Sequence, residues 1–214
     1  MPTTQFDNKL DRESINPRLQ AFEKFISGMY LGEITRNLLL SLIDGAPKPL
    51  LFNGRSSKLL NSHYGLDTAV LSEVESVWES GRQPDVGVKG VEGGQDPIAK
   101  EQPEAPKPKI NGSAPEPAHF LDIDSHSPED RSRLERIRSV IVQRMELADE
   151  DVTLRDAAIV RWASALVADR AAKLSACAVA TVLVQTGRAK LGGGVVPEEE
   201  HLIVGVDGRY VRRD

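Results

Sequence analysis

The 214-residue sequence predicts a helix-rich α/β fold. Apolar residues recur at three- and four-residue steps through residues 17–43, and similar spacing returns over 128–148 and 153–185. This spacing is typical of helices that pack one face against a core. Near the C-terminus, residues 201–206 form a short apolar run that leads directly into a turn sequence, as a buried strand does. Helices accompanied by a buried strand indicate an α/β domain.

The composition favours a soluble protein of the cytoplasm. The formal net charge of −5 gives no reason to expect a nucleic acid or an anionic membrane as a partner. Cys177 is the single cysteine, so no internal disulfide can form, and the first residues do not read as a secretory leader. The most apolar stretch, 174–184, has roughly half of the ~20 residues that a membrane span needs, so we expect a buried helix there.

Residues 1–80 are expected to form one folded block. Asn16 is a suitable N-cap, and Pro17 suits the first helical position because its missing N–H is not needed there. The apolar stripe that follows runs to a turn sequence at residues 44–47. A further helix is predicted over residues 68–78, where valine and leucine side chains share one face.

Two glycines, Gly28 and Gly32, interrupt the first predicted helix. Each costs up to about 1 kcal/mol relative to alanine inside a helix. In a helix that is otherwise well formed, we expect them to allow another backbone or a ligand to approach closely.

Residues 81–118 differ in composition from the rest of the chain. They are rich in proline, glycine, lysine and glutamate and contain almost no large apolar side chains. Such a segment cannot bury enough surface to offset the entropy lost on ordering, so a disordered insertion is predicted. We expect a tolerated surface loop, although the segment could carry regulation.

Residues 119–214 return to an ordered pattern. Ser127 begins a helix whose first turn is acidic, and Thr153 with Asp156 resembles a capping arrangement for the next one. Within that second helix, residues 171–184 are small and apolar on nearly every side. Small side chains let a helix lie close to its neighbours, so this part is predicted to lie deep in the fold.

Chemistry-bearing residues are few when the sequence is read on physical grounds alone. The strand predicted to end at Asp207-Gly208 could hold a phosphate or a nucleotide, but the same dipeptide is common in ordinary turns. Glu23 could accept hydrogen bonds from sugar hydroxyls, although an exposed helix charge is the favoured interpretation. Cys177 is expected to be a small core residue. No metal site is expected, because the histidines have no ligand spacing: His63, His119, His126 and His201.

Residues 16–33 resemble a segment of eukaryotic hexokinases and glucokinases. That segment reads Asn-Pro-Gly-x-Gln, then Glu-Lys, Gly and Leu-Gly-Glu, and the chain carries most of it from Asn16 to Glu33. Further stretches match the family in the same order along the chain: 68–75, 170–175 and 204–208. Together these matches identify most of the chain, outside 81–118, as similar to the family.

The resemblance implies a fold, an activity and a set of contacts. The fold would be part of the large lobe of an actin-like, ribonuclease-H-like sugar kinase. The activity would be phosphorylation of a hexose at O6, with glucose as the expected sugar and with ATP and Mg²⁺ as cofactors. The family positions that contact the sugar correspond to Glu23 and Gln20. Those on the nucleotide side correspond to Thr68, Ser72, Gly205, Asp207 and Gly208.

The chain also departs from the family pattern. Arg18 replaces the usual glycine, and Arg209 replaces the usual serine after Asp207-Gly208. No Gly-Gly-Thr phosphate loop, no Asp-Thr-Gly and no partner for the catalytic aspartate occurs in the sequence, so no catalytic residue is assigned. Those pieces, and the other lobe, would precede Met1 in a full enzyme. Because phosphoryl transfer depends on positioning and charge stabilisation at the γ-phosphate, we expect this chain alone to be inactive.

A second interpretation stays open at this point. The chain could be a non-catalytic hexokinase-like protein that senses sugar or binds a partner through residues 81–118. A purely helical scaffold would require the family match to be coincidental and ranks below both.

Overall fold

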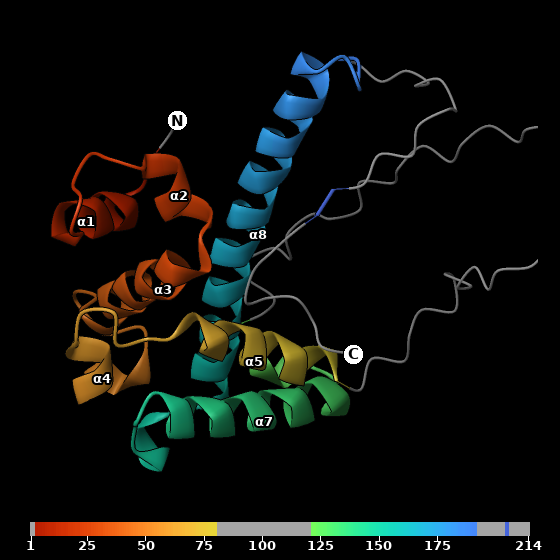
Figure 1. Cartoon of the computed structure of the whole chain (residues 1–214). Coiled ribbons are helices and arrows are strands. Elements are labelled where there is room, and N and C mark those ends of the chain that lie inside the picture. The colour runs from red at the N-terminus through yellow and green to blue at the C-terminus, as the bar shows by residue number, and fades with distance from the viewer. Residues whose placement is uncertain (1–2, 81–120, 192–203, 206–214) are drawn as a thin grey trace, which may run out of the picture.

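The computed structural model describes residues 3–80, 121–191 and 204–205 (Figure 1). Within these ranges the chain forms helices and no β-strand. With the labels of Figure 1, the α-helices are α1 (Gln5–Glu13), α2 (Ala21–Ile26), α3 (Gly28–Ile43), α4 (Lys58–Asn61), α5 (Thr68–Glu79), α7 (Pro128–Arg144) and α8 (Leu154–Gln185). Short 3₁₀ helices cover Phe52–Gly54, Ile123–Ser125 and Asp149–Asp151.

The α/β character expected from the sequence is not seen in the described residues. Of the strand predicted over 201–206, only Val204 and Gly205 are described, and neither lies in a strand. The insertion predicted over 81–118 lies outside the described residues. The described fold is therefore helical, and the strand stays a prediction.

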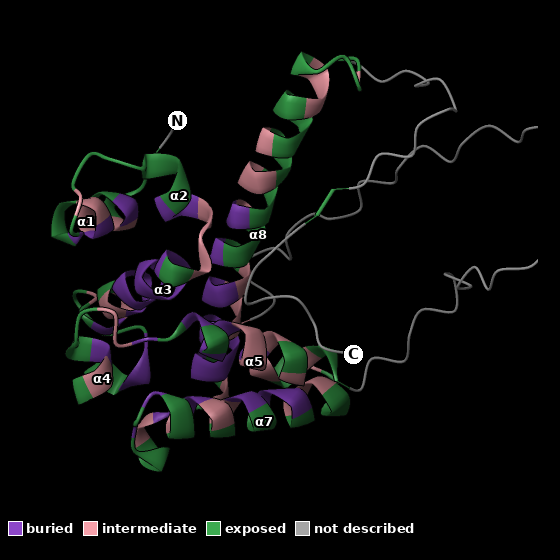
Figure 2. Cartoon of the chain, in the orientation of Figure 1, coloured by how far each residue is buried: buried purple, intermediate pink, exposed green. Residues whose placement is uncertain are grey.

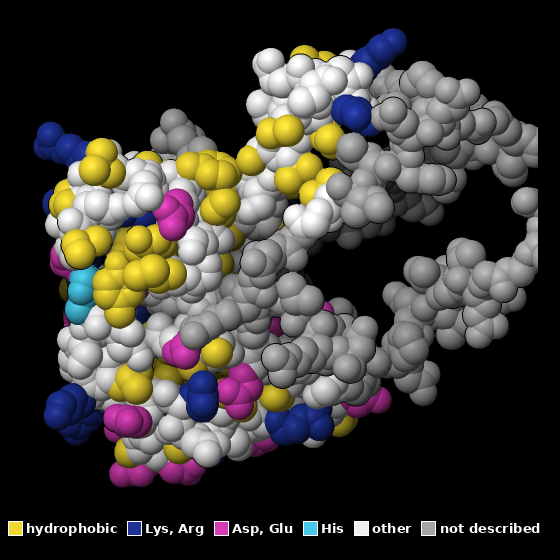
Figure 3. Space-filling model, viewed as in Figure 1, with side chains coloured by type: hydrophobic (Ala, Val, Ile, Leu, Met, Phe, Trp, Pro, Cys, Tyr) yellow, Lys and Arg dark blue, Asp and Glu magenta, His cyan; other side chains and the backbone are white. Residues whose placement is uncertain are grey.

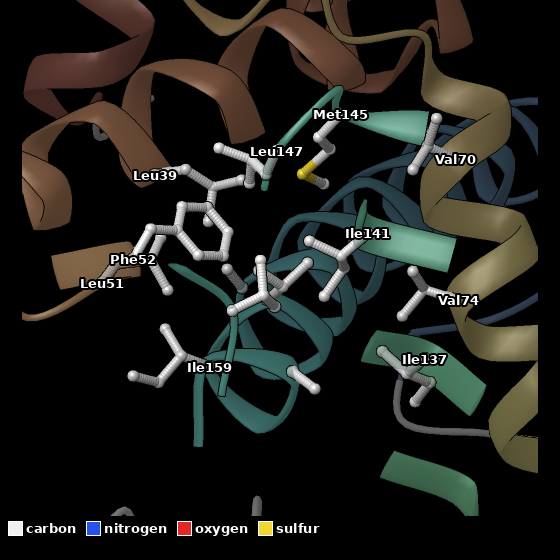
Figure 4. Close-up of a cluster of buried hydrophobic side chains, with 14 of the residues drawn as sticks. Leu39, Leu51, Phe52, Val70, Val74, Ile137, Ile141, Met145, Leu147 and Ile159 are labelled. Atoms are coloured by element: carbon white, nitrogen blue, oxygen red, sulfur yellow. The ribbon is translucent and has the colours of Figure 1, made fainter. Parts of the chain in front are cut away.

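Helices α3, α5 and α7 share one hydrophobic core with the first half of α8. Helix α8 contacts α3, α5 and α7, and α5 also packs between α3 and α7. Figure 4 shows side chains from these helices and from the segment before α4 pointing toward one another. The buried residues labelled there are Leu39, Leu51, Phe52, Val70, Val74, Ile137, Ile141, Met145, Leu147 and Ile159.

Local sequence signals placed several helix ends correctly. The Ser127 hydroxyl caps α7 by accepting the N–H of Asp130 at 3.1 Å. Thr153 and Asp156 form a capping box at the start of α8, and the Asp156 carboxylate also accepts the N–H of Phe52 at 3.0 Å. Capping hydrogen bonds join residues that are two or three apart in the sequence. They can therefore be predicted without knowledge of the tertiary fold.

The predicted helix from Pro17 to residue 43 is wrong in its first part. The structure has two helices, α2 and α3, separated at Ser27, which is extended (φ −75°, ψ 134°) and caps α3. Pro17 precedes both helices, and α2 begins only after Gln20. A left-handed residue at Gln20 delays the start, because a right-handed helix cannot pass through that conformation.

The second half of α8 is exposed, contrary to the prediction (Figure 2). From Ala172 onward the described residues of α8 are exposed or half-buried, and Cys177 is exposed. The prediction failed because small apolar side chains indicate how closely a helix can pack, not how far its neighbours extend. In Figure 1, α8 continues past the other labelled helices. Among the described helices, none has the length and apolar character that a membrane span requires.

Close approach of another backbone at Gly32 is confirmed. An ideal Cβ there would lie 2.3 Å from the carbonyl oxygen of Leu66 and 2.8 Å from the N of Thr68. The Thr68 hydroxyl accepts the N–H of Gly32 at 2.8 Å and donates to the carbonyl of Gly28 at 2.5 Å. In a regular α-helix the N–H of Gly32 would donate directly to the carbonyl of Gly28, four residues earlier. Here the Thr68 hydroxyl lies between these two groups and bridges the first turn of α3.

A buried ion pair ties α1 to α8. The guanidinium of Arg170 donates two hydrogen bonds to the Asp7 carboxylate, at 2.7 and 2.8 Å, and the Asp7 side chain is only 1% exposed. The backbone N–H and hydroxyl of Thr4 donate to the same carboxylate at 2.8 and 2.7 Å. Burial alone would raise the pKa of Asp7, but these hydrogen bonds outweigh it and hold the pKa below its ordinary value of 3.8.

We expect Asp7 to make the stability of the protein depend on acid pH. A carboxyl whose pKa is lowered by folding stabilises the native state above its unfolded pKa, and this contribution is lost as the pH falls through the folded value. Replacing Asp7 with asparagine should lower the free energy of unfolding by roughly 2 kcal/mol at pH 7. The difference from wild type should shrink as the pH falls below about 3.8, as measured by urea unfolding at a series of pH values.

The matched control is Asp169→Asn, which breaks an exposed ion pair with Lys173 on the same helix as Arg170. It should change the free energy of unfolding by less than about 1 kcal/mol. An Asp7→Asn variant whose deficit stayed constant down to the lowest pH would contradict the assignment.

Candidate functional site

The segment before α2 has an unusual backbone. Arg18 (φ 65°) and Gln20 (φ 53°) both lie in the left-handed region. This conformation costs roughly 1–2 kcal/mol for a residue with a Cβ, whereas glycine adopts it freely. Arg18 stands where the family resemblance leads one to expect glycine, so the backbone accounts for that preference. Arg18 adopts this left-handed conformation although it has a Cβ, at the energetic cost stated above.

Two charged side chains hold this segment. Lys24 is only 1% exposed, and its Nζ donates to Asp11 Oδ1 and to the carbonyl of Asn16, both at 2.7 Å. Each Asp11 carboxylate oxygen lies 3.0 Å from the backbone N–H of Arg18. The hydrogen bonds from Lys24 and Arg18 lower the pKa of Asp11 below its ordinary value of 3.8. Asp11 is therefore a carboxylate at neutral pH, paired with a buried ammonium.

Gln20 and Glu23 lie at the same end of α2. Gln20 is the left-handed N-cap of α2, and Glu23 lies in its first turn. Both are exposed. The side-chain amide of Asn16 donates to Gln20 Oε1. In the view of Figure 3, hydrophobic side chains gather on the N-terminal helices.

The Glu23 carboxylate makes no hydrogen bond or ion pair with any other residue that the structure describes. The exposed pair therefore presents amide donors from Gln20 beside carboxylate acceptors from Glu23. A group that carries adjacent hydroxyls would satisfy both.

The two predicted nucleotide contacts on α5 have different environments. Thr68 is buried, and its hydroxyl bridges Gly32 and Gly28 as described above. Ser72 is half-buried one turn further on, and its buried hydroxyl has no hydrogen-bond partner. Thr68 thus has a structural task in the described fold, whereas the hydroxyl of Ser72 has none.

The remaining predicted nucleotide contacts are described only in part. Gly205 is exposed, with nothing within 4 Å of the position where a Cβ would lie. Asp207 and Gly208 lie outside the described residues. The structure thus places Gln20 and Glu23 at the same end of α2, and Thr68 and Ser72 on α5.

Sequence analysis missed a cluster at the junction of α1, α3 and the segment after α4. Ligand atoms of Glu13, Glu33 and His63 lie within 4.8 Å of one another, and Glu13 and His63 also line an open cavity of about 470 Å³. The Glu33 carboxylate, however, already accepts hydrogen bonds from Arg36 and from the N–H of Tyr64. With that carboxylate committed to a guanidinium, Glu13 and His63 are too few to hold a metal ion, so we assign none.

The sequence could not have indicated this cluster or the Asp11–Lys24 pair. Lysine and glutamate are usually exposed, and only the fold reveals which of them are buried together. In the Glu-Lys dipeptide at 23–24, the family resemblance implies a role for the glutamate only.

Known hexokinases are similar to this chain in sequence. The hexokinase family model matches residues 1–86 and 114–213. The chain is similar to hexokinase-2 of Homo sapiens, with 51% identity over 73 residues that make up 34% of this chain and 8% of that protein. It is similar to hexokinase-3 of Mus musculus (47% over 74 residues; 35% and 8%) and to hexokinase-1 of Schizosaccharomyces pombe (41% over 75 residues; 35% and 15%).

The chain spans only a small part of the length of these curated relatives. The family model, by contrast, covers most of the 214 residues and leaves out the middle of the segment predicted as an insertion. The resemblance drawn from residues 16–33 is confirmed, and the chain belongs to the hexokinase family.

Proposed function

We propose that this chain is part of a cytoplasmic hexose kinase that transfers the γ-phosphoryl group of ATP to O6 of a hexose, with glucose as the first substrate to test. The whole protein would have the α/β, actin-like architecture of a sugar kinase, and the described helices would belong to its large lobe. The family membership supports the reaction class.

The exposed pair of Gln20 and Glu23 is the observation that carries the proposal. A carboxylate accepts hydrogen bonds from two sugar hydroxyls, and a neighbouring amide donates to a third oxygen. A site built to hydrogen-bond a substrate hydroxyl discriminates against analogues that lack it, and a bound sugar would pair its hydroxyls with both groups. The pair is therefore suited to select a hexose by its hydroxyl pattern.

The nucleotide side of the proposal rests on α5 and the segment at 205–208. A buried hydroxyl without a partner, as at Ser72, is the kind of group that a phosphate or ribose oxygen satisfies. Gly205, Asp207 and Gly208 are the other nucleotide contacts that the family resemblance implies, and Thr68 would support the helix. MgATP would supply the phosphoryl group, and Mg²⁺ would enter with the nucleotide phosphates.

We propose further that the polypeptide 1–214 binds sugar weakly and does not turn it over. The sequence contains no Gly-Gly-Thr or Asp-Thr-Gly, and no residue of the described part is assigned as the base that would take the proton of the sugar hydroxyl. Phosphoryl transfer needs charge stabilisation around the γ-phosphate and an aligned hydroxyl.

Glucose titration of the ¹⁵N-labelled chain tests the sugar site. Glucose should shift the amide resonances of residues 20–25, and Glu23→Gln should weaken binding at least about tenfold, because hydrogen bonds to a charged group contribute roughly 1.5–3 kcal/mol. Glu129→Gln is the matched control, since Glu129 is also exposed in the first turn of a helix. Glucose-induced shifts that are absent, or equally weakened by Glu129→Gln, would contradict the site.

The same preparation with glucose and ATP should form no glucose 6-phosphate above the blank. Measurable turnover would overturn the claim that the chain alone is inactive.

A further inference from the structure

Lys24 is a fully buried ammonium beside the sugar-contact pair. Burying an ammonium carries a large desolvation penalty that a partner must offset. Apolar side chains in place of both members of a buried ion pair would avoid that penalty, and such double replacements are often neutral or stabilising. We therefore ask which backbone conformation the charge of Lys24 stabilises.

Both partners of Lys24 lead to the segment that ends at Gln20. The ammonium holds the carbonyl of Asn16 directly, and through Asp11 it holds the N–H of Arg18. The side chain of Asn16 then donates to Gln20 Oε1. A continuous series of contacts thus runs from the buried ammonium to the amide of Gln20.

The backbone at the end of this series is strained. Arg18 and Gln20 are both left-handed although neither is glycine. Such residues persist only where the surrounding contacts determine them, and they concentrate at functional sites. Here the determining contacts are those of Asp11 and Lys24.

We propose that Asp11 and Lys24 are positioning residues of the proposed sugar site, which hold Arg18 and Gln20 in their left-handed conformations and thereby fix the Gln20 side chain at the end of α2 where Glu23 also lies. The inference rests on the proposed function, because it assumes that Gln20 contacts the sugar. Without the ammonium, Arg18 and Gln20 relax toward the favoured regions, and the Gln20 side chain is no longer fixed at the start of α2.

The experiment combines amide hydrogen exchange without sugar and glucose titration on the full chain. Lys24→Met keeps an unbranched side chain and removes the ammonium. We expect the amides of Arg18 and Leu19 to exchange at least tenfold faster and the glucose affinity to fall at least tenfold. The amides of Ile137 and Ile141, in the core helix α7, should keep their wild-type exchange rates. Lys173→Met, which breaks an exposed pair on α8, should change neither readout.

Asp11→Asn is the second variant, because it removes one charge but leaves an oxygen for Lys24, and it should show the same changes to a smaller extent. Exchange at Arg18 and Leu19 that stays at the wild-type rate would overturn the inference. So would an equal acceleration at Ile137 and Ile141, since that would mean a general loss of stability. Wild-type protein that fails to respond to glucose would overturn the proposed function, while the exchange rates, measured without sugar, would still decide whether Lys24 holds the segment.

Discussion

Gly32→Ala is expected to destabilise the protein by about 3 kcal/mol or more, toward the upper end of the effects of overpacking. The added Cβ would lie 2.3 Å from the Leu66 carbonyl oxygen and 2.8 Å from both the N and the Oγ1 of Thr68. Two of these three atoms are backbone, which cannot turn aside as a side-chain end can. To admit the methyl group, α5 would have to move away from α3 and withdraw the Thr68 hydroxyl from the groups that it bridges.

Urea unfolding followed by circular dichroism measures this effect. Gly45→Ala is the matched control, because its nearest neighbour would be 3.3 Å from the new Cβ and it lies just after the end of the same helix. It should change the free energy of unfolding by no more than about 1 kcal/mol. A Gly32→Ala protein as stable as wild type would mean that α3 and α5 do not approach as closely as described.

Gly32 also illustrates what the sequence can reveal. A glycine inside a well-patterned helix predicts a close approach, since nothing else offsets its cost. The sequence did not show that the approaching group is the backbone at 66–68. That partner is more than thirty residues away, and only packing brings it to the glycine.

The errors in the helical prediction arise where local sequence patterns are compatible with more than one structure. Ser27 is compatible with a helix interior and with a cap, and only the left-handed Gln20 and the extended backbone of Ser27 divide the predicted helix. The second half of α8 has the composition of a buried helix, but burial depends on neighbours that composition does not specify. Caps such as Ser127 and Thr153 were predicted because their partners are three residues away.

For the proposed site, the family resemblance pointed to Gln20 and Glu23 but not to the residues that support them. Glu23 and Gln20 were found through the family resemblance, and the structure places them at one end of α2. The buried Lys24 was not found, because nothing in a single sequence distinguishes a buried lysine from an exposed one.

Arg36→Met is expected to be the most destabilising removal of a charge. Glu33 is fully buried, and Arg36, with a side chain only 4% exposed, donates to its carboxylate at 2.7 and 2.5 Å and to the carbonyl of Leu60 at 2.7 Å. Methionine would leave the carboxylate of Glu33 buried without its counter-charge. Breaking a buried pair in this way costs roughly 3–5 kcal/mol, so a domain of ordinary stability would lose a large part of it.

A second substitution separates the lost charge balance from lost packing. Glu33→Gln added to Arg36→Met removes the unpaired charge but keeps an oxygen for the N–H of Tyr64, which lies 2.8 Å from the native carboxylate. The double variant should therefore be more stable than Arg36→Met alone, as measured by urea unfolding. Arg144→Met, which breaks an exposed pair with Glu73, should cost less than about 1 kcal/mol. If the double variant were the less stable of the two, the volume of Arg36 rather than its charge would be what the core of α3 requires.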